Sequence, residues 1–222
     1  MANNGVGSLD QVRKKLTYTT DLISTSYHEA GHTVYGLLHF MKISSVWVVE
    51  NKKLKRFEGF CHYEIGLDLS EIKDSVICAE RVKAEVCLKY AGLAADRYHF
   101  KSISGSDKYP LFLRTGSSDD ILEAAALIRE YNLAPPGKKR YNFKNKLIKE
   151  TSKDLQDNWD AVTIVAHTLF KKKRLSYISL KKLLTTQTND PGFWKHNFSI
   201  LESIFNKQNP LDEKELKYIL FG

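Results

Sequence analysis

The pattern of apolar and polar residues along the chain predicts a mainly helical protein with one small β element. Apolar residues recur at helical spacing over residues 22–41 and again over residues 70–100. Between these segments, residues 43–49 and 58–65 are rich in β-branched and aromatic side chains, and they flank a charged turn at residues 51–56. We therefore expect a helix, a β-hairpin and a second long helix, in that order.

The second half of the chain is almost entirely helical in pattern. Helical spacing resumes at Ser118, and after the break at Ala134-Pro135-Pro136-Gly137 it predicts one long helix over residues 144–172. Residues 175–184 are expected to form a short final helix pair. The predicted fold class is mainly α, of the α+β type, with a hairpin or short sheet beside the first helix.

Two changes in composition divide the chain into three parts. Residues 1–20 are expected to form a loosely held N-terminal arm, and residues 21–187 a compact domain. Residues 188–222 form a C-terminal extension that is rich in aromatic side chains. This extension is too apolar for a plain disordered end, so we expect it to dock on the domain or on a partner.

Composition narrows the protein class. The sequence has no run of 18 apolar residues and no basic start followed by an apolar run, so we expect no membrane span and a cytoplasmic location. The three cysteines form no C-x-x-C pair, which indicates reduced thiols.

The net charge of +8 is concentrated in one region. Residues 138–182 contain 13 Lys and Arg against 4 Asp and Glu, a net charge of +9. Such a region is typical of a solvated helix face, and it is also compatible with an acidic partner or nucleic acid. Because no nucleic-acid-binding motif accompanies it, the sequence does not favour a nucleic-acid partner.

The segment His28-Glu29-Ala30-Gly31-His32 carries the clearest chemistry in the chain. Residues four apart lie on one face of a helix about one turn apart, so both imidazoles can bind one metal ion. A glutamate between them can act as general base towards water without binding the metal. The pattern predicts a hydrolytic zinc site with His28 and His32 as ligands and Glu29 as the catalytic residue.

Ser26 and Glu29 also allow a structural interpretation. The pattern S-x-x-E is a capping box, in which both side chains satisfy backbone donors at a helix start. Under that interpretation Glu29 has no catalytic role, but both histidines remain unexplained.

A catalytic zinc ion usually has three protein ligands, so one ligand is missing from this motif. His39 nearly completes the pattern H-E-x-x-H-x-x-G-x-x-H, but it lies one residue late, about 10 Å along the helix axis from His32. We therefore exclude His39 as a ligand. The remaining candidates are acidic, and spacing alone does not choose among them: Asp96, Asp119, Asp120 and Glu123.

Three segments of the sequence resemble FtsH-type zinc peptidases in their order and approximate spacing. They are H-E-A-G-H at residues 28–32, A-G-L-A-A-D at residues 91–96, and T-G-S-S-D-D-I at residues 115–121. The corresponding stretches in that family look like H-E-A-G-H, G-R-A-A-E-E and T-T-G-A-S-N-D-L. The resemblance covers about residues 22–187.

The resemblance implies a zinc peptidase domain with Asp120 as the third zinc ligand and Asp96 as an acid beside the site. FtsH proteins also carry transmembrane helices and an ATPase module, but this sequence contains no G-x-x-x-x-G-K-[ST] phosphate loop. The resemblance therefore implies a peptidase without its own motor. A separate ATPase or a host protease is a possible partner, and the ring-forming family implies a homo-oligomer.

The functional hypothesis is a Zn2+-dependent endopeptidase that cleaves unfolded or extended polypeptides. The peptide would add as a strand to an exposed edge of the hairpin at residues 43–65. The alternative is a weak or inactive peptidase-like protein that oligomerises with a partner protease and regulates it. A third hypothesis, nucleic-acid binding, rests only on the basic region at residues 138–182.

Overall fold

A computed structural model describes residues 21–64, 75–106, 108 and 117–205 of the chain. Within these ranges the protein is 72% helical, with seven helices and a three-stranded antiparallel sheet, which confirms the predicted fold class. The expected N-terminal arm at residues 1–20 lies outside the described residues, as do residues 65–74 and 206–222.

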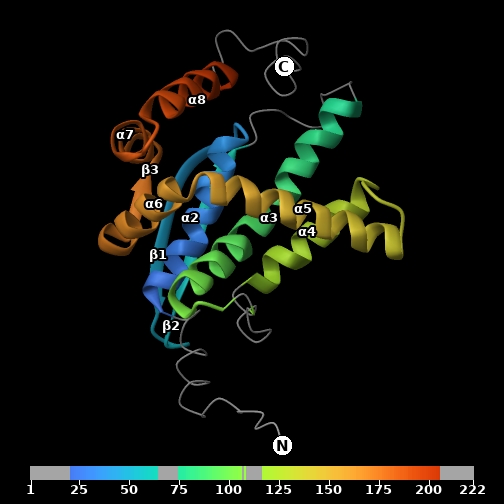
Figure 1. The fold of residues 1–222 in the computed structure, drawn as a ribbon, viewed down its shortest axis with the longest axis horizontal. Helices are drawn as coiled ribbons and strands as arrows, with labels where there is room; N and C mark the ends of the chain where they lie inside the picture. The colour runs from blue at the N-terminus through green and yellow to red at the C-terminus, as the bar shows by residue number, and fades with distance from the viewer. Residues whose placement is uncertain (1–20, 65–74, 107, 109–116, 206–222) are drawn as a thin grey trace, which may run out of the picture.

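Helix α2, Leu22–Leu38, is the element around which the others pack. It contacts the long helix α3 (Ser75–Ser104), helix α6 (Trp159–Lys172) and the sheet (Figure 1). Residues 24–37 of α2 are all buried. The helix begins after Asp21, whose carboxylate accepts a hydrogen bond from the Ser24 backbone N–H at 2.7 Å, an N-cap that fixes its first turn.

The sheet consists of β1, Lys42–Asn51, β2, Arg56–Glu64, and β3, Arg174–Ser176. Strands β1 and β2 form the predicted hairpin. The strand order is β2-β1-β3, so β2 lies at one edge of the sheet.

The prediction of a helix pair at residues 175–184 is wrong. Residues 174–176 pair with β1 as strand β3, and a single helix, α7, follows at Tyr177–Gln187. Leu175 faces Val46 across the strands and is buried, so tertiary pairing decides the conformation. Three residues are too few to show a strand period in the sequence.

Helix α3, Ser75–Ser104, lies alongside α2, and the two helices approach closely at Gly31. A Cβ atom at Gly31 would lie 2.6 Å from the Ala91 carbonyl oxygen and 2.6 Å from the Ala95 Cβ. The small residues of both helices therefore allow their backbones to meet. Helix α4, Ser118–Glu130, begins at the residue where the sequence pattern predicts that helical spacing resumes. It packs on α3.

The single helix expected over residues 144–172 is two helices. Helix α5 runs over Lys138–Asp157 and helix α6 over Trp159–Lys172, with Asn158 between them at φ −120°. The Asn158 side chain donates a hydrogen bond to the Asp154 carbonyl oxygen at 2.9 Å. Asn competes in this way with regular helix hydrogen bonds, which explains the break after Asp157.

The aromatic segment after α7 docks on the domain, as the sequence predicts. Helix α8, Pro191–Ile204, packs on α7 and α2 and lies with α7 at one end of the molecule (Figure 1). Trp194 and Phe198 are fully buried in the same hydrophobic core as α2.

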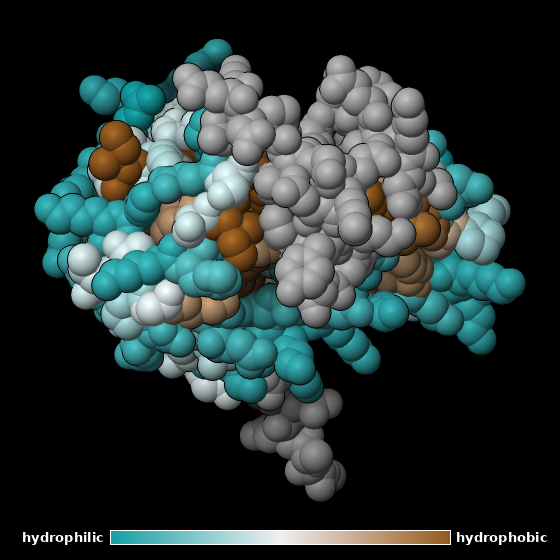
Figure 2. Space-filling model, turned by 90° about the horizontal axis from the view of Figure 1, so that it is seen from above, coloured by the Kyte–Doolittle hydropathy of each residue, from teal (hydrophilic) through white to brown (hydrophobic). Residues whose placement is uncertain are grey.

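No helix in the described ranges combines the length and the apolar character that crossing a membrane requires. In the view of Figure 2, hydrophilic residues cover most of the described surface.

An aromatic cluster ties α2 to α3 and α6. Tyr27 stacks on His99 with ring centroids 3.7 Å apart and on Trp159 at 5.6 Å, and its hydroxyl lies 3.2 Å from the His167 Nε2. Burial lowers the pKa of His99 to about 4, although Asp96 acts in the opposite direction.

Replacing Gly31 by Ala is expected to destabilise the fold by about 1–3 kcal/mol, because the added methyl group overpacks the contact with α3. Gly192→Ala in α8 is the matched control. Its Cβ would meet nothing nearer than 3.4 Å, so we expect no loss of stability there. Urea unfolding of both variants measures the difference, and equal stabilities would contradict the close approach of α2 and α3.

Protonation of His99 is expected to oppose folding in acid. Because the folded pKa of about 4 lies below the unfolded value of 6.5, the unfolded state binds the proton first. Stability is therefore lost as the pH falls from about 6.5 to about 4, by at most about 3 kcal/mol. The His99→Phe variant, which cannot titrate, should show a smaller loss in urea unfolding between pH 7 and pH 4. An identical pH dependence in both proteins would argue against a buried neutral His99.

Candidate metal centre

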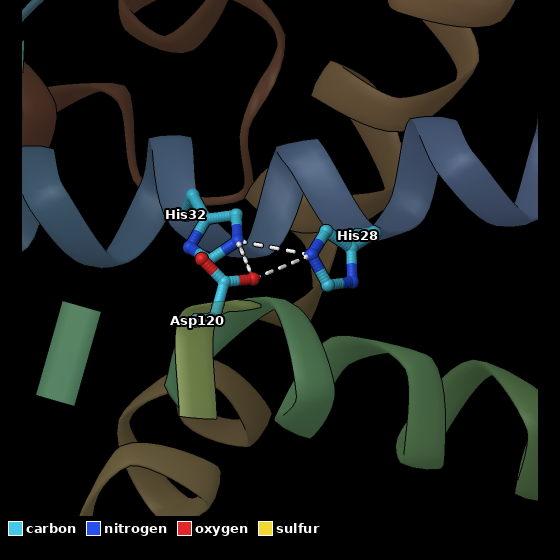
Figure 3. A group of neighbouring side chains, drawn as sticks. All are labelled: His28, His32 and Asp120. Atoms are coloured by element: carbon cyan, nitrogen blue, oxygen red, sulfur yellow. Dashed lines mark hydrogen bonds and ion pairs between the residues drawn. The ribbon is translucent and has the colours of Figure 1, made fainter. Parts of the chain in front are cut away.

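Three donor atoms from two helices converge on one point in the structure. His28 and His32 lie one turn apart on α2, and Asp120 lies in the first turn of α4 (Figure 3). The two Nε2 atoms are 3.1 Å apart, and the Asp120 Oδ2 lies 3.2 Å from that of His28 and 3.4 Å from that of His32. Both histidines are buried, and Asp120 is partly exposed.

The other nitrogen of each imidazole is already engaged. The His28 Nδ1 lies 2.8 Å from the Asp96 Oδ2, and the His32 Nδ1 lies 2.8 Å from the Leu88 carbonyl oxygen. A carbonyl and a carboxylate oxygen accept hydrogen bonds, so both Nδ1 atoms carry the proton when the rings are neutral. Each Nε2 then points a lone pair towards the other and towards Asp120.

Three electron-pair donors so close together repel one another unless a cation lies between them. In a tetrahedral zinc site with ligand distances of about 2.0–2.2 Å, the ligand atoms are separated by about 3.3–3.6 Å. The observed separations of 3.1 to 3.4 Å are close to these values. Two imidazoles and one carboxylate are also a common catalytic zinc ligand set, so the residues fit a zinc ion.

The electrostatics of the group favour a cation as well. Burial by itself would lower the pKa of His28, but Asp96 and Asp120 outweigh it and raise that pKa well above its usual value. Burial would raise the pKa of Asp120, yet His32 and His28 reverse the effect and lower it. The charges around the site therefore favour a positive charge between these groups, either a proton or a metal ion.

Glu29 lies beside these donors but faces the sheet. Its carboxylate packs directly against Gly59 of β2, where a side chain would collide with it. Burial raises the pKa of Glu29, and the partial opposing effect comes from His32 and His28. A raised pKa makes the carboxylate a stronger base, which suits general-base chemistry near neutral pH.

The capping-box interpretation of Ser26 and Glu29 is wrong. Helix α2 begins at Leu22, four residues before Ser26, and its N-cap residue is Asp21. Ser26 lies inside the helix, where its hydroxyl donates to the Leu22 carbonyl oxygen at 2.7 Å. Glu29 is therefore free of any role at the helix start.

Gly92 of α3 leaves room for both imidazoles. A Cβ atom there would collide with the His28 ring and with the His32 Nε2. The A-G-L-A-A-D segment thus contributes two things to the site: Gly92 leaves space for the two imidazole rings, and Asp96 bonds to the ring of His28. The buried Ser117 hydroxyl lies 3.4 Å from the Asp96 Oδ2 and helps to fix it.

The other candidate ligands lie apart from the donor group. Asp119 is exposed at the start of α4, and the Glu123 carboxylate pairs with the Lys89 Nζ at 2.6 Å. The His39 Nε2 lies 3.1 Å from the Asp154 Oδ2, so its exclusion as a ligand agrees with the structure. Asp96 contacts the first histidine from behind, in the supporting position that the resemblance implies.

A cleft of about 490 Å³ leads to the donor group. Residues 56–61 of the edge strand β2 form one wall, and Lys89 and the start of α4 lie among the residues of the other walls. The edge of the hairpin that the sequence predicts as a peptide-binding strand therefore borders the cleft.

Several contributors to this site escape sequence reasoning. The Leu88 carbonyl is a backbone group and carries no residue signal, and Gly59 and Lys89 become neighbours of the site only through packing. Ser117 lies in the T-G-S-S-D-D-I segment, three residues before Asp120, and this proximity in sequence is the one indication that it belongs to the site.

In comparisons with known proteins, no protein-family model matches the chain, and no curated protein matches it. The assignment of a function therefore rests on the site itself.

Asp96→Asn is expected to weaken zinc binding by about 10–100-fold without unfolding the protein, because it removes the charge that orients and polarises His28. Asp154→Asn is the matched control, since Asp154 also pairs with a histidine, His39, outside the donor group. Competition with a chromophoric chelator measures both affinities. Equal zinc affinities for the two variants would contradict the role given to Asp96.

Proposed function

We propose that this protein is a zinc-dependent endopeptidase that cleaves unfolded or extended polypeptide segments. The observation that carries the proposal is the triad of lone-pair donors from His28, His32 and Asp120, with the Glu29 carboxylate next to it in an open cleft. Three protein donors and an adjacent buried acid are the parts that metal-assisted hydrolysis needs.

A bound zinc ion would supply Lewis acidity, polarising a peptide carbonyl and lowering the pKa of a neighbouring water molecule. His28, His32 and Asp120 would hold the ion, and Asp96 and the Leu88 carbonyl keep both imidazoles in the orientation that this requires. Glu29 accepts the proton of the attacking water and passes it to the leaving amine. Its raised pKa matches both halves of that transfer.

The shape of the cleft supports an extended polypeptide as substrate. Strand β2 offers one unpaired edge of the described sheet along the cleft wall, close to Glu29. A peptide that pairs with this edge is held by its backbone, which places few demands on its side chains. Folded chains expose few segments that can add a strand, so unfolded segments are the proposed substrates.

The FtsH-type resemblance belongs to the same proposal. The three sequence segments that carry it meet at the donor group, since His28 lies 2.8 Å from the Asp96 carboxylate and 3.2 Å from that of Asp120. The convergence of the three segments in space supports the proposed similarity to FtsH-type peptidases, although no family model and no curated protein matches the chain.

The direct test measures zinc content and casein degradation in three variants. Glu29→Gln should keep zinc and lose activity by about 10²–10⁴-fold, because it removes the general base. Asp120→Ala should lose both zinc and activity, because two histidines alone bind zinc weakly.

Asp119→Ala is the control for the Asp120 variant. It removes an adjacent carboxylate that lines the same cleft outside the donor group, and it should retain zinc and activity. Full peptidase activity in Glu29→Gln would refute the proposed mechanism, and equal zinc loss in the Asp119 and Asp120 variants would refute the ligand assignment.

A further inference from the structure

Three side chains form a stacked row across the sheet, and the row ends at the open edge. Arg174 of β3, Trp47 of β1 and Phe60 of β2 are direct cross-strand neighbours in the register of the sheet. The Arg174 guanidinium carbon lies 5.3 Å from the centre of the Trp47 ring. The Trp47 and Phe60 ring centroids are also 5.3 Å apart, with 22° between the ring planes. Each side chain therefore packs on the next across all three strands.

The row lies on the outer face of the sheet, away from α2. Val46 and Val48, the neighbours of Trp47 in β1, are buried in the hydrophobic core. Successive side chains of a strand point to opposite faces, so Trp47 points away from that core. On β2, Gly59 packs against α2, and Phe60, the next residue, therefore also points outward.

Phe60 is an unusual residue for its position in the edge strand. The other outward-facing residues of β2 are polar or charged: Arg56, Glu58, His62 and Glu64. Native sheets protect open edges with such side chains, because an exposed apolar edge invites another strand. Phe60 is 41% exposed near the middle of β2, so the edge keeps one apolar contact point where protection is expected.

The same edge borders the cleft of the candidate metal centre. Gly59 lies against the Glu29 carboxylate, and both Gly59 and Phe60 are among the residues that line the cleft. A polypeptide added to β2 as a further strand would point alternate side chains towards α2 and onto the outer face. The outward side chain that pairs with Phe60 would then become the next member of the row.

We propose, on the basis of the peptidase function proposed above, that Phe60 selects polypeptides with an aromatic side chain at the position opposite it on the added strand. Aromatic pairs across neighbouring strands are favourable beyond the apolar area that they bury. Trp47 packs on the Phe60 ring and holds it in place, and a ring from the substrate covers its exposed side. Because Phe60 follows Gly59, the selected residue lies close to the cleaved bond.

Peptide binding to the full-length Glu29→Gln protein in the presence of zinc tests this selection without turnover. The probes are short peptides of Ser and Thr that carry one central Phe, Leu or Ala, and amide NMR shifts follow each titration. We expect the Phe peptide to bind about 3–10-fold more tightly than the Ala peptide, with the Leu peptide weaker than the Phe peptide. The shifted amides should include those of residues 58–62.

Variants in the same background assign the preference to Phe60. Phe60→Ala should bind the Phe and Ala peptides equally, and unchanged affinity for the Ala peptide shows that the edge is intact. Phe60→Tyr keeps a ring and should keep the preference. Phe193→Ala is the matched control, because Phe193 is 42% exposed but lies in α8, outside the sheet and the cleft. It should bind all the peptides as the parent protein does.

Cleavage by the protein with Glu29 intact gives a second readout. Casein fragments mapped by mass spectrometry should show an aromatic residue at one fixed position relative to the cleaved bond. Phe60→Ala should still cut casein but lose this preference. Absence of casein cleavage would refute the proposed peptidase, whereas the binding titrations decide the role of Phe60 by themselves.

Three results would overturn the selection by Phe60. The first is equal binding of the Phe peptide and either the Leu or the Ala peptide. The second is a Phe preference that survives Phe60→Ala or that Phe193→Ala also removes. The third is self-association of the peptide-free protein in sedimentation that Phe60→Ala abolishes, because a second copy of the chain would then occupy this edge.

Discussion

The close contact between α2 and α3 is the constraint on which the rest of the site depends. Gly31 and Gly92 lack side chains where a Cβ would strike the opposite helix or the imidazoles. Because these two positions carry no side chain, the α3 backbone comes near enough for the Leu88 carbonyl to accept a hydrogen bond from His32. The Asp96 carboxylate likewise comes within hydrogen-bond distance of His28. With both Nδ1 atoms engaged, the two Nε2 atoms face each other and the Asp120 carboxylate.

The remaining elements complete this arrangement from two sides. Helix α4 packs on α3 and brings Asp120 to the two histidines, and the Ser117 hydroxyl before it touches Asp96. Strand β2 closes the opposite side with Gly59 against Glu29. The buried acids and imidazoles would be costly by themselves, because each buried polar group needs a partner or a counter-charge. A cation in the centre satisfies three of them together.

The sequence predicts the parts of this site that depend on local geometry. Two histidines four residues apart share a helix face whatever the rest of the fold does, so His28 and His32 needed no tertiary information. The identification of Asp120 did need tertiary information, because four acids had comparable helical contexts in the sequence. The packing of α4 on α3 brings Asp120 to the two histidines. Family resemblance pointed to Asp120, whereas spacing alone left the choice open.

The errors in the predicted fold have the same origin. The break at Asn158 depends on one side chain competing for a helix carbonyl, and β3 exists because β1 offers a partner to three residues that have no period of their own. The long periodic segments that became α2 and α3 were predictable, since their apolar spacing persists over many turns.

X-ray absorption spectroscopy of the zinc-loaded protein is the sharpest test of the metal centre, because it reports the atoms bound to the metal. We expect a shell of nitrogen and oxygen atoms only, at about 2.0–2.2 Å, with the multiple-scattering signature of two imidazoles. A sulfur atom at about 2.3 Å, or the signature of fewer than two imidazoles, would contradict a centre built from His28, His32 and Asp120.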